Sequence, residues 1–236
     1  MAHRIWITAD THFGHKFVVA LRGFDDVAEH DRMLIENWNS VVAPNDAVYH
    51  LGDVSMSLHG LESVAKLNGR KILVAGNHDQ CWHRRSNRSD IRRALRKIDT
   101  YYQAGFCEVI TSGSMIYNPA KSGPVLLSHL PMRGDHMGEE RYGKRRPPPG
   151  ELPILCGHVH GAWRIDGGKQ LNVGVDVNGF RPILINDAIV EVRALDGAGA
   201  IGASIDGPWR DFGPALQERH RFLVVASRGL RLSQHH

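Results

Sequence analysis

The sequence has few of the features that mark secreted, fibrous or membrane-embedded proteins. Its three cysteines, Cys81, Cys107 and Cys156, form no close pair, and their odd number argues against a disulfide framework. No stretch approaches the roughly 20 apolar residues that a membrane-spanning helix needs. Residues 1–10 lack the long apolar run and the cleavage site of a signal peptide. We therefore predict a cytoplasmic protein with no membrane partner.

The composition is ordinary except for its histidines. Hydrophobic residues make up 42% of the chain and charged residues 23%, which is typical of a globular protein. The net charge of +4 is compatible with an anionic substrate or with nucleic acid, and it establishes neither. There are 15 histidines, and several lie beside aspartate, asparagine or glycine. The 236 residues suit one large domain with an appendage, which we place at residues 1–190 and 191–236, the latter an extension of unknown role.

Short apolar segments rich in β-formers predict strands over residues 5–9, 48–51, 71–75, 125–127 and 154–156. A further strand is predicted over 170–177, and the apolar pattern continues over 183–193. Apolar spacing predicts helices over 27–42, 58–67 and 89–98, the last with Ile91, Leu95 and Ile98 facing inward. Residues 131–150, dense in Arg, Pro and Gly, predict an irregular loop. Its segment 141–149 either covers a site or lies on the surface.

A polar group of metal-ligand type follows each of the first five strands. The groups are Asp10-Thr11-His12, Gly52-Asp53, Gly76-Asn77-His78-Asp79, Ser128-His129 and Gly157-His158-Val159-His160. Strand ends line one edge of a sheet, where open α/β folds place their sites. We expect the Asp10-x-His12 and His158-x-His160 pairs to lie on extended chain, with both side chains of each pair on one face.

These side chains indicate a site for two metal ions. Carboxylate, amide oxygen and imidazole donors suit divalent first-row metals such as Mn, Fe, Co, Ni or Zn. The groups offer more donors than one tetrahedral ion requires, so two ions that share a carboxylate account for them best. We expect the glycines before Asp53, Asn77 and His158 to permit the sharp turns that bring the ligands together.

The order DxH, GD, GNHD, isolated His and GHxH resembles the calcineurin-like metallophosphoesterases. The motifs span Asp10 to His160, and residues 172–182 also resemble small bacterial and bacteriophage members. The resemblance implies an α/β (α+β) fold of the four-layer αββα type. In that fold two mixed β-sheets are flanked by helices, and a dinuclear metal site lies at the carboxyl ends of the strands.

The resemblance also assigns roles to residues. It implies that Asp53 bridges two metal ions, that the first ion takes Asp10, His12 and His160, and that the second takes Asn77, His129 and His158. A hydroxide held between the ions would attack phosphorus in line, while the ions neutralise the developing charge. His78 would stabilise the transition state or protonate the leaving oxygen. Mn is the expected metal, with Fe, Zn, Co and Ni left open.

The substrate side of the site is less determined. His15, Asn77, Arg133 and Arg181 are our candidates for contacts with substrate, the arginines because a guanidinium can clamp a phosphate. Protein phosphatases of this family carry Asp-Arg-Gly shortly after the bridging aspartate, whereas Asp53 is followed by Val-Ser-Met. The chain also has GNHD in place of GNHE. Both differences argue against a protein phosphatase and favour a diesterase or a small-molecule phosphatase. Our leading prediction is a phosphodiesterase that acts on nucleotides or other small phosphoesters.

Three alternatives stay open. They are a small-molecule phosphomonoesterase, a DNA or RNA nuclease and, from a different class, a non-catalytic scaffold. A nuclease would need a surface for nucleic acid, and we interpret the basic face formed by Arg92, Arg93, Arg96 and Lys97 as the solvated side of a helix. The sequence leaves the oligomeric state open.

Overall fold

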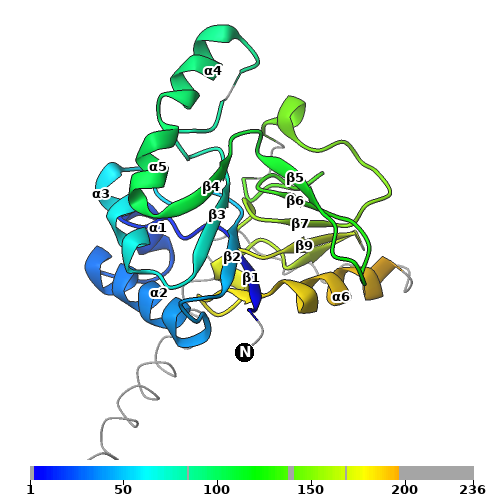
Figure 1. Ribbon diagram of the computed structural model, residues 1–236, viewed down its shortest axis with the longest axis horizontal. Coiled ribbons are helices and arrows are strands. Elements are labelled where there is room, and N and C mark those ends of the chain that lie inside the picture. Colours follow the sequence, from blue (N-terminus) through cyan, green and yellow to red (C-terminus); the bar gives the residue numbers. More distant parts are fainter. Residues whose placement is uncertain (1–2, 84, 138–140, 168, 197–236) are drawn as a thin grey trace, which may run out of the picture.

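The computed structural model describes residues 3–83, 85–137, 141–167 and 169–196 of the chain. Two five-stranded sheets face each other, and most of the helices lie on the outer side of the first sheet (Figure 1). Each sheet contains parallel and antiparallel pairs, so the expectation of two mixed sheets flanked by helices is confirmed. Most of the predicted C-terminal extension lies outside the described residues.

The first sheet has the strand order β10-β1-β2-β3-β4. Its strands are β1 (Ile5–Thr8), β2 (Ala47–His50), β3 (Arg70–Val74), β4 (Phe106–Ile110) and β10 (Ile183–Leu184). β1 to β4 are parallel, and β10 pairs with β1 in the antiparallel sense. Parallel neighbours require helical crossovers. These are α1 (Lys16–Leu21), α2 (Val27–Val41), α3 (Leu58–Leu61), the 3-10 helix η1 (Glu62–Lys66), α4 (Arg88–Leu95) and α5 (Ile98–Ala104).

The second sheet has the order β5-β6-β7-β9-β8. Its strands are β5 (Ser114–Tyr117), β6 (Val125–Ser128), β7 (Ile154–Cys156), β8 (Ile165–Asp166) and β9 (Gln170–Asn172). β6, β7 and β9 are parallel, whereas β5 and β8 are antiparallel edge strands. Two 3-10 helices, η2 (Gly143–Arg145) and η3 (Val175–Val177), lie outside the strands, and α6 (Ile185–Asp196) follows β10.

Three clusters of buried apolar side chains form the core of the protein. The cluster between the helices and the first sheet includes Leu34, Trp38 and Tyr101. The cluster between the two sheets includes Ile7 of β1, Leu127 of β6 and Leu155 of β7, with Ile185, Ala188, Ile189 and Val192 of α6 packed into it. On the outer face of the second sheet, Ile154 and Cys156 pack against Val159 and Trp163 of the following loop. The two sheets are therefore held face to face with their strand ends adjacent.

The predicted helix over 89–98 is confirmed as α4 up to Leu95, and a separate helix, α5, begins at Ile98. Of the predicted inward face, Ile98 packs against the core, whereas Ile91 and Leu95 were predicted wrongly. The helix α4 stands away from the body of the molecule (Figure 1). Ile91 and Leu95 are 36% and 52% exposed, and Ala94 is the buried residue of α4. Apolar spacing predicts which residues share a helix face, but it does not tell whether another layer covers that face.

Other differences arise where local patterns are weak. The predicted strand over 170–177 ends at Asn172, because residues 175–177 form the turn η3. The helices α1 and α5 and the strands β4 and β5 were not predicted. The helix α6 continues across residue 190, where we placed the end of the main domain. In the described part of the chain, no helix has the length and apolar character that crossing a bilayer requires.

Candidate metal centre

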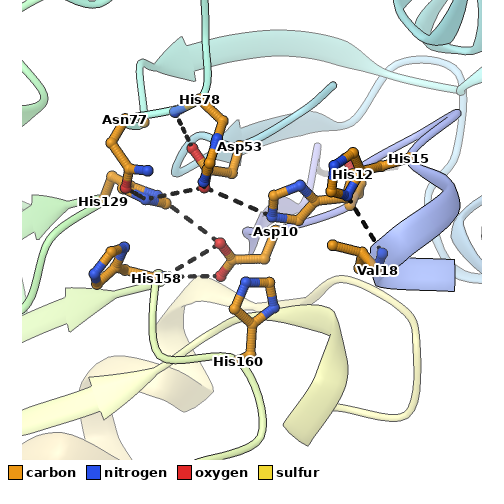
Figure 2. Close-up of polar contacts among 12 residues, drawn as sticks. Asp10, His12, His15, Val18, Asp53, Asn77, His78, His129, His158 and His160 are labelled. Carbon is orange, nitrogen blue, oxygen red and sulfur yellow. Dashed lines mark hydrogen bonds and ion pairs between the residues drawn. The ribbon is translucent and has the colours of Figure 1, made fainter. Parts of the chain in front are cut away.

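The seven predicted metal ligands converge where the two sheets meet (Figure 2). Asp10, Asp53 and Asn77 follow β1, β2 and β3 of the first sheet, and His129 and His158 follow β6 and β7 of the second. All seven are nearly fully buried: Asp10, His12, Asp53, Asn77, His129, His158 and His160. The carboxyl ends of strands from both sheets thus supply one compact group of donors.

Most of these ligands have a backbone conformation that residues other than glycine rarely adopt. The left-handed φ angles are 60° at Asp10, 49° at His12, 55° at Asp53, 73° at His158 and 48° at His160. The extended chain that we predicted for Asp10-x-His12 and His158-x-His160 is therefore wrong. Such conformations cost on the order of 1–3 kcal/mol each and persist where the surrounding structure enforces them, as at functional sites. Their concentration at five ligands supports a functional centre here.

The glycines of the motifs allow close packing of the ligand turns. Gly52 lies against the backbone of Gly76, and Gly52 has a left-handed φ of 85°. A Cβ at Gly76 would collide with Asp53 and lie 2.8 Å from Nδ1 of His129, and one at Gly157 would lie 2.6 Å from Oδ2 of Asp10. Close approach, rather than an unusual φ, is thus what requires glycine at positions 76 and 157.

Distances among the donors define two overlapping groups. Ligand atoms of Asp10, His12 and His160 all lie within 4.8 Å of one another, and so do those of Asp10, Asp53 and His129. Oδ2 of Asp53 lies 3.6 Å from Nε2 of His12 and 3.4 Å from Nε2 of His129. Asp10 is thus common to both groups, and Asp53 of the second group also lies near His12 of the first. The bridging role of Asp53 stays a prediction.

The two remaining predicted ligands, Asn77 and His158, differ in their position relative to these groups. Oδ1 of Asn77 lies 2.9 Å from Nε2 of His129, which places it beside the second group. The backbone N–H of His158 donates to the Asp10 carboxylate, but its ring forms a third donor group, with Asp135 and His136. The structure thus brings six of the seven side chains together directly, and turns the imidazole of His158 toward Asp135.

Outer partners orient two of the histidines. Nδ1 of His129 lies 2.8 Å from the carbonyl oxygen of Leu51, and Nδ1 of His160 lies 2.9 Å from Oδ2 of Asp176. These contacts leave Nε2 of each ring for the pocket, because a hydrogen bond at one imidazole nitrogen selects the tautomer. Asp176 is in turn held by the fully buried Arg22, which donates to both of its oxygens at 2.8 Å.

The sequence interpretation did not assign roles to Asp176, Arg22 or Asp79. Asp79 accepts hydrogen bonds from the backbone N–H groups of Asp53, Val54 and Gly76, so it joins two ligand turns. The available signals were the GNHD motif, which contains Asp79, and the NVGVD segment, which contains Asp176. Arg22 had no motif that could have indicated it.

The electrostatics of the pocket fit bound cations. Burial raises the pKa of Asp53 to about 7, and burial together with the nearby Asp53 carboxylate raises that of Asp10 well above its usual range. Burial also lowers the pKa of His12 and His129, so these imidazoles are uncharged. Among the described residues, no lysine or arginine forms an ion pair with either of these adjacent buried carboxylates, and divalent ions would supply compensating charge.

His12 provides a direct test of this fit. Both of its ring nitrogens are buried, and neither has a hydrogen-bond partner. A buried polar atom without a partner costs free energy, so such groups call for an explanation. Coordination of a divalent ion by one of the two ring nitrogens would give that nitrogen a partner. The described residues therefore fit the divalent metals that the donor types favour.

His78 and His15 lie at the margin of the donor groups (Figure 2). The side chain of His78 is 32% exposed, its Nε2 lies 3.9 Å from Oδ2 of Asp53, and its ring centroid is 5.6 Å from that of His12. The ring of His15 is also 5.6 Å from that of His12, but its Nδ1 accepts a hydrogen bond from the backbone N–H of Val18 and caps α1. His78 is thus accessible from solvent beside the metal ligands, and His15 has a structural role as well.

The two candidate arginines lie elsewhere. Nε of Arg133 donates to Asp166 at 3.1 Å, and Arg181 is exposed on the surface. Among the described residues, no hydrogen bond or ion pair joins either arginine to a predicted metal ligand. Both stay predictions, and the structure adds no contact in their favour.

The fold and the donor groups define a class of metal-dependent phosphoester hydrolases. The chain belongs to the calcineurin-like phosphoesterase family, whose model matches residues 3–162. The chain is 34% identical over 187 residues to the Gene 66 protein of Mycobacterium phage L5, a match that covers 74% of this chain and 87% of that protein. Identity to the Gene 66 protein of Mycobacterium phage D29 is 31% over 183 residues, covering 73% and 87%.

A solved structure is also similar. It is the crystal structure of a protein of unknown function from Aquifex aeolicus, with a TM-score of 0.56 and 25% identity. The match covers 79% of this chain and 98% of that one. The likeness therefore extends over nearly the whole of a smaller protein.

Proposed function

We propose that the protein is a dinuclear metal-dependent phosphodiesterase that acts on nucleotides or other small phosphoesters. One observation carries the proposal: two donor groups, Asp10-His12-His160 and Asp10-Asp53-His129, share Asp10, and Asp53 also lies near His12 of the first group. Family membership supports phosphoester hydrolysis in general. The preference for small diesters rests on the sequence, in which no arginine follows the bridging aspartate as in protein phosphatases.

Each ligand then has a role. Asp10, His12 and His160 would hold one ion, Asn77, His129 and His158 the other, and Asp53 both. Bound divalent ions would acidify a water molecule and neutralise charge on the phosphoryl oxygens. We propose Mn as the metal, with Fe, Zn, Co or Ni as alternatives, because these donors suit all of them.

The remaining polar groups would act on the substrate. The amide nitrogen of Asn77 is buried without a hydrogen-bond partner, so it can donate to a phosphate oxygen as well as offer its oxygen to a metal. The half-exposed imidazole of His78 lies beside Asp53, where it can protonate the leaving oxygen. His15 is close enough to His12 to contact a bound phosphate.

The test combines metal content with activity. The purified protein is analysed for bound metals and assayed with Mn²⁺ on a generic phosphodiester and a generic phosphomonoester. His78→Ala is expected to reduce diester cleavage at least ~100-fold, which is the usual range for loss of a catalytic acid. Asn77→Ala removes a proposed ligand of the second ion and is expected to reduce diester cleavage as well. The control is His59→Ala, which removes an exposed histidine paired with Glu62 on the surface.

The outcomes separate the alternatives. About two metals per chain with diester cleavage lost in both variants supports the proposal. A preference for the monoester redirects it to a small-molecule phosphatase. No metal and no turnover on either substrate would overturn it and leave a non-catalytic scaffold. The cytoplasmic location stays a prediction from the sequence.

A nuclease is the second candidate, and α4 is the observation that favours it. Arg88 and Arg92 on this helix and Arg96 at its C-cap are spaced four residues apart, and all are exposed, as is Arg85 before the helix. The helix follows β3, the strand that leads into Asn77 and His78, and it projects beyond that end of the sheet (Figure 1). A row of exposed arginines on a helix that follows the ligand-bearing turn after β3 can contact the phosphates of a polynucleotide.

Salt and substrate length distinguish this candidate from the first. A variant with Arg88, Arg92 and Arg96 all changed to glutamine is compared with Arg32→Gln, which changes an exposed arginine of α2. A nuclease predicts slower cleavage of single-stranded DNA in the triple variant, a weaker dependence on salt, and unchanged cleavage of the small diester. Equal activity of both variants on DNA, or no cleavage of DNA, would exclude it.

A further inference from the structure

The loop after β6 places a buried carboxylate against a predicted metal ligand. Oδ2 of Asp135 lies 3.0 Å from Nε2 of His158, and the side chains are 1% and 2% exposed. A neutral imidazole has one N–H and one lone-pair nitrogen. Since a carboxylate only accepts, Nε2 of His158 must carry the proton, and Nδ1 is then the nitrogen left to bind a metal.

Two arginines fix the carboxylate in place. Nη2 of Arg141 donates to Asp135 at 2.8 Å and Nη2 of Arg146 at 3.0 Å. Arg146 is almost fully buried, and it also donates to the backbone carbonyls of Pro131, Gly134 and Arg141. Asp135 is therefore held by Arg141 at one carboxylate oxygen and by Arg146 at the other, and the latter oxygen also contacts His158. The irregular sequence of the loop predicted none of this order.

We propose that Asp135 is a positioning residue that sets the tautomer and the orientation of His158 for the second metal ion, and that Arg141 and Arg146 hold it for this purpose. The inference rests on the proposed function, because it concerns the same dinuclear site. Carboxylates that accept from a metal-bound imidazole commonly change metal affinity by 10–100-fold when they are removed.

The first donor group contains the same arrangement. Asp176 accepts from Nδ1 of His160, and Arg22 holds Asp176 with two hydrogen bonds. An imidazole, a carboxylate and an arginine thus occur once in each proposed metal set, from different parts of the chain. The nitrogen that the carboxylate occupies differs, being Nε2 in His158 and Nδ1 in His160. The two pairs therefore serve as controls for each other.

A metal ion held by Asp135 itself is the competing interpretation, since Asp135, His136 and His158 could together surround an ion. The charges argue against it. Two arginines already compensate the Asp135 carboxylate, and an added divalent ion would lie beside both guanidinium groups. In addition, Nδ1 of His136 is engaged with the carbonyl oxygen of His158 at 2.8 Å.

The test measures metal binding in the full chain. Metal-free wild-type protein, Asp135→Asn and Asp176→Asn are titrated with Mn²⁺ by calorimetry, and the free ion is followed by electron paramagnetic resonance. Asp135→Asn is expected to weaken one of the two ions by ~10–100-fold and to leave the other unchanged. His129→Ala in the second set identifies which ion is affected, since combining it with Asp135→Asn then costs little further affinity. Asp176→Asn is expected to weaken the other ion.

A second measurement detects positioning directly. Nitrogen-15 spectra of the histidine rings distinguish protonation at Nδ1 from protonation at Nε2. In metal-free wild-type protein the His158 proton is expected at Nε2, and Asp135→Asn is expected to shift the tautomer balance. Arg141→Gln removes the more exposed arginine while Arg146 keeps the loop anchored, so it is expected to weaken the same ion only a few-fold. Thermal unfolding of each variant shows whether it is folded.

The results distinguish failure of the two proposals. If the wild-type protein binds no metal, the proposed function fails. In that case, a His158 proton that is found at Nε2 and depends on Asp135 shows that the hydrogen bond exists in a protein that binds no metal. The positioning proposal is then overturned together with the proposed function. If two ions bind and Asp135→Asn weakens neither, weakens both equally, or leaves the His158 tautomer unchanged, Asp135 is not a positioning residue. A third ion lost in Asp135→Asn would favour the competing interpretation.

Discussion

At the scale of single residues, the centre combines strained backbone with close packing. Five ligands have left-handed φ angles, and the glycines beside them leave no room for a side chain. Because the surroundings enforce these conformations, small changes in the turns move ligand atoms. The position of a carboxylate oxygen depends here on the absence of a single methyl group.

Gly157→Ala tests this dependence. A Cβ at position 157 would lie 2.6 Å from both Oδ2 of Asp10 and Cβ of Ala9, so one of the turns has to shift. We expect a loss of roughly 1–3 kcal/mol in the free energy of unfolding from overpacking. We also expect at least ~10-fold weaker Mn²⁺ binding, because Asp10 is displaced. Urea denaturation and calorimetry measure the two effects.

Gly143→Ala is the matched control. Gly143 has no atom within 4 Å of an added Cβ and does not have a left-handed φ. Its change should stay within about 0.5 kcal/mol in stability, with unaltered metal binding. Equal effects of the two substitutions would show that the packing at Gly157 does not position Asp10.

At the scale of elements, Asp46 ties the end of α2 to the start of β1. Its carboxylate accepts hydrogen bonds from Nε1 of Trp6 at 2.9 Å and from the backbone N–H groups of Arg4 and Ala43 at 3.0 Å. Burial alone would raise the pKa of Asp46, but these hydrogen bonds outweigh it and lower the pKa to about 2. The carboxylate thus stabilises the fold in its charged form.

Asp46→Asn is expected to destabilise the protein in a pH-dependent manner. The folded pKa of about 2 lies below the usual value of 3.8, so the contribution is complete above about pH 4 and is lost as the pH falls toward 2. We expect a deficit of about 1–3 kcal/mol at pH 7, typical of charge-assisted hydrogen bonds. Urea denaturation of both proteins between pH 2 and pH 7 checks it.

The exposed Asp25 provides the comparison for Asp46. Asp25→Asn should change the free energy of unfolding by less than about 0.5 kcal/mol at every pH. A deficit in Asp46→Asn that stays constant down to pH 2 would indicate lost packing rather than a lost carboxylate.

At the scale of the whole molecule, the centre joins the two sheets. Asp10, Asp53 and Asn77 come from the first sheet, whereas His129, His158 and His160 follow strands of the second. A cation bound among them contacts both sheets at once and binds only when they are packed together. Metal binding should therefore stabilise the fold as a whole.

We expect Mn²⁺ to raise the unfolding temperature, and to raise it more at higher pH. An ion present at 100 times its Kd adds about 2.7 kcal/mol, or roughly 5–10 °C for a chain of this size. Burial raises the pKa of Asp53 to about 7. In the metal-free protein, the stability that this group contributes in its protonated form is therefore lost as the pH rises from about 4 through 7. Above pH 7 the ion no longer competes with that proton.

Scanning calorimetry at pH 5, 6, 7 and 8, with Mn²⁺ or with a chelator, measures the shift. A shift that is independent of pH would show that Asp53 does not take part in binding. The absence of a shift at every pH would contradict the metal centre itself.

The sequence by itself determined the donor types and the strands that carry them. Alternating and apolar patterns are local, and the motifs lie directly after β1, β2, β3, β6 and β7, so five short segments predicted the candidate ligands. The order of these motifs, through its resemblance to a known family, predicted the fold class. The edge strands β4 and β5 and the exposed position of α4 did not follow, because their local patterns do not say what packs against them.

Only the tertiary structure decided how the candidate ligands are oriented. Arg22 and Asp176 are 154 positions apart in the sequence, yet they form an ion pair, and Asp176 also contacts His160. Asp135 contacts His158 from an irregular loop. The left-handed turns at Asp10 and His158 replaced the extended chain that spacing suggested. Such partners are selected by the packing of two sheets against each other, and a contact between distant segments leaves no periodic signal along the chain.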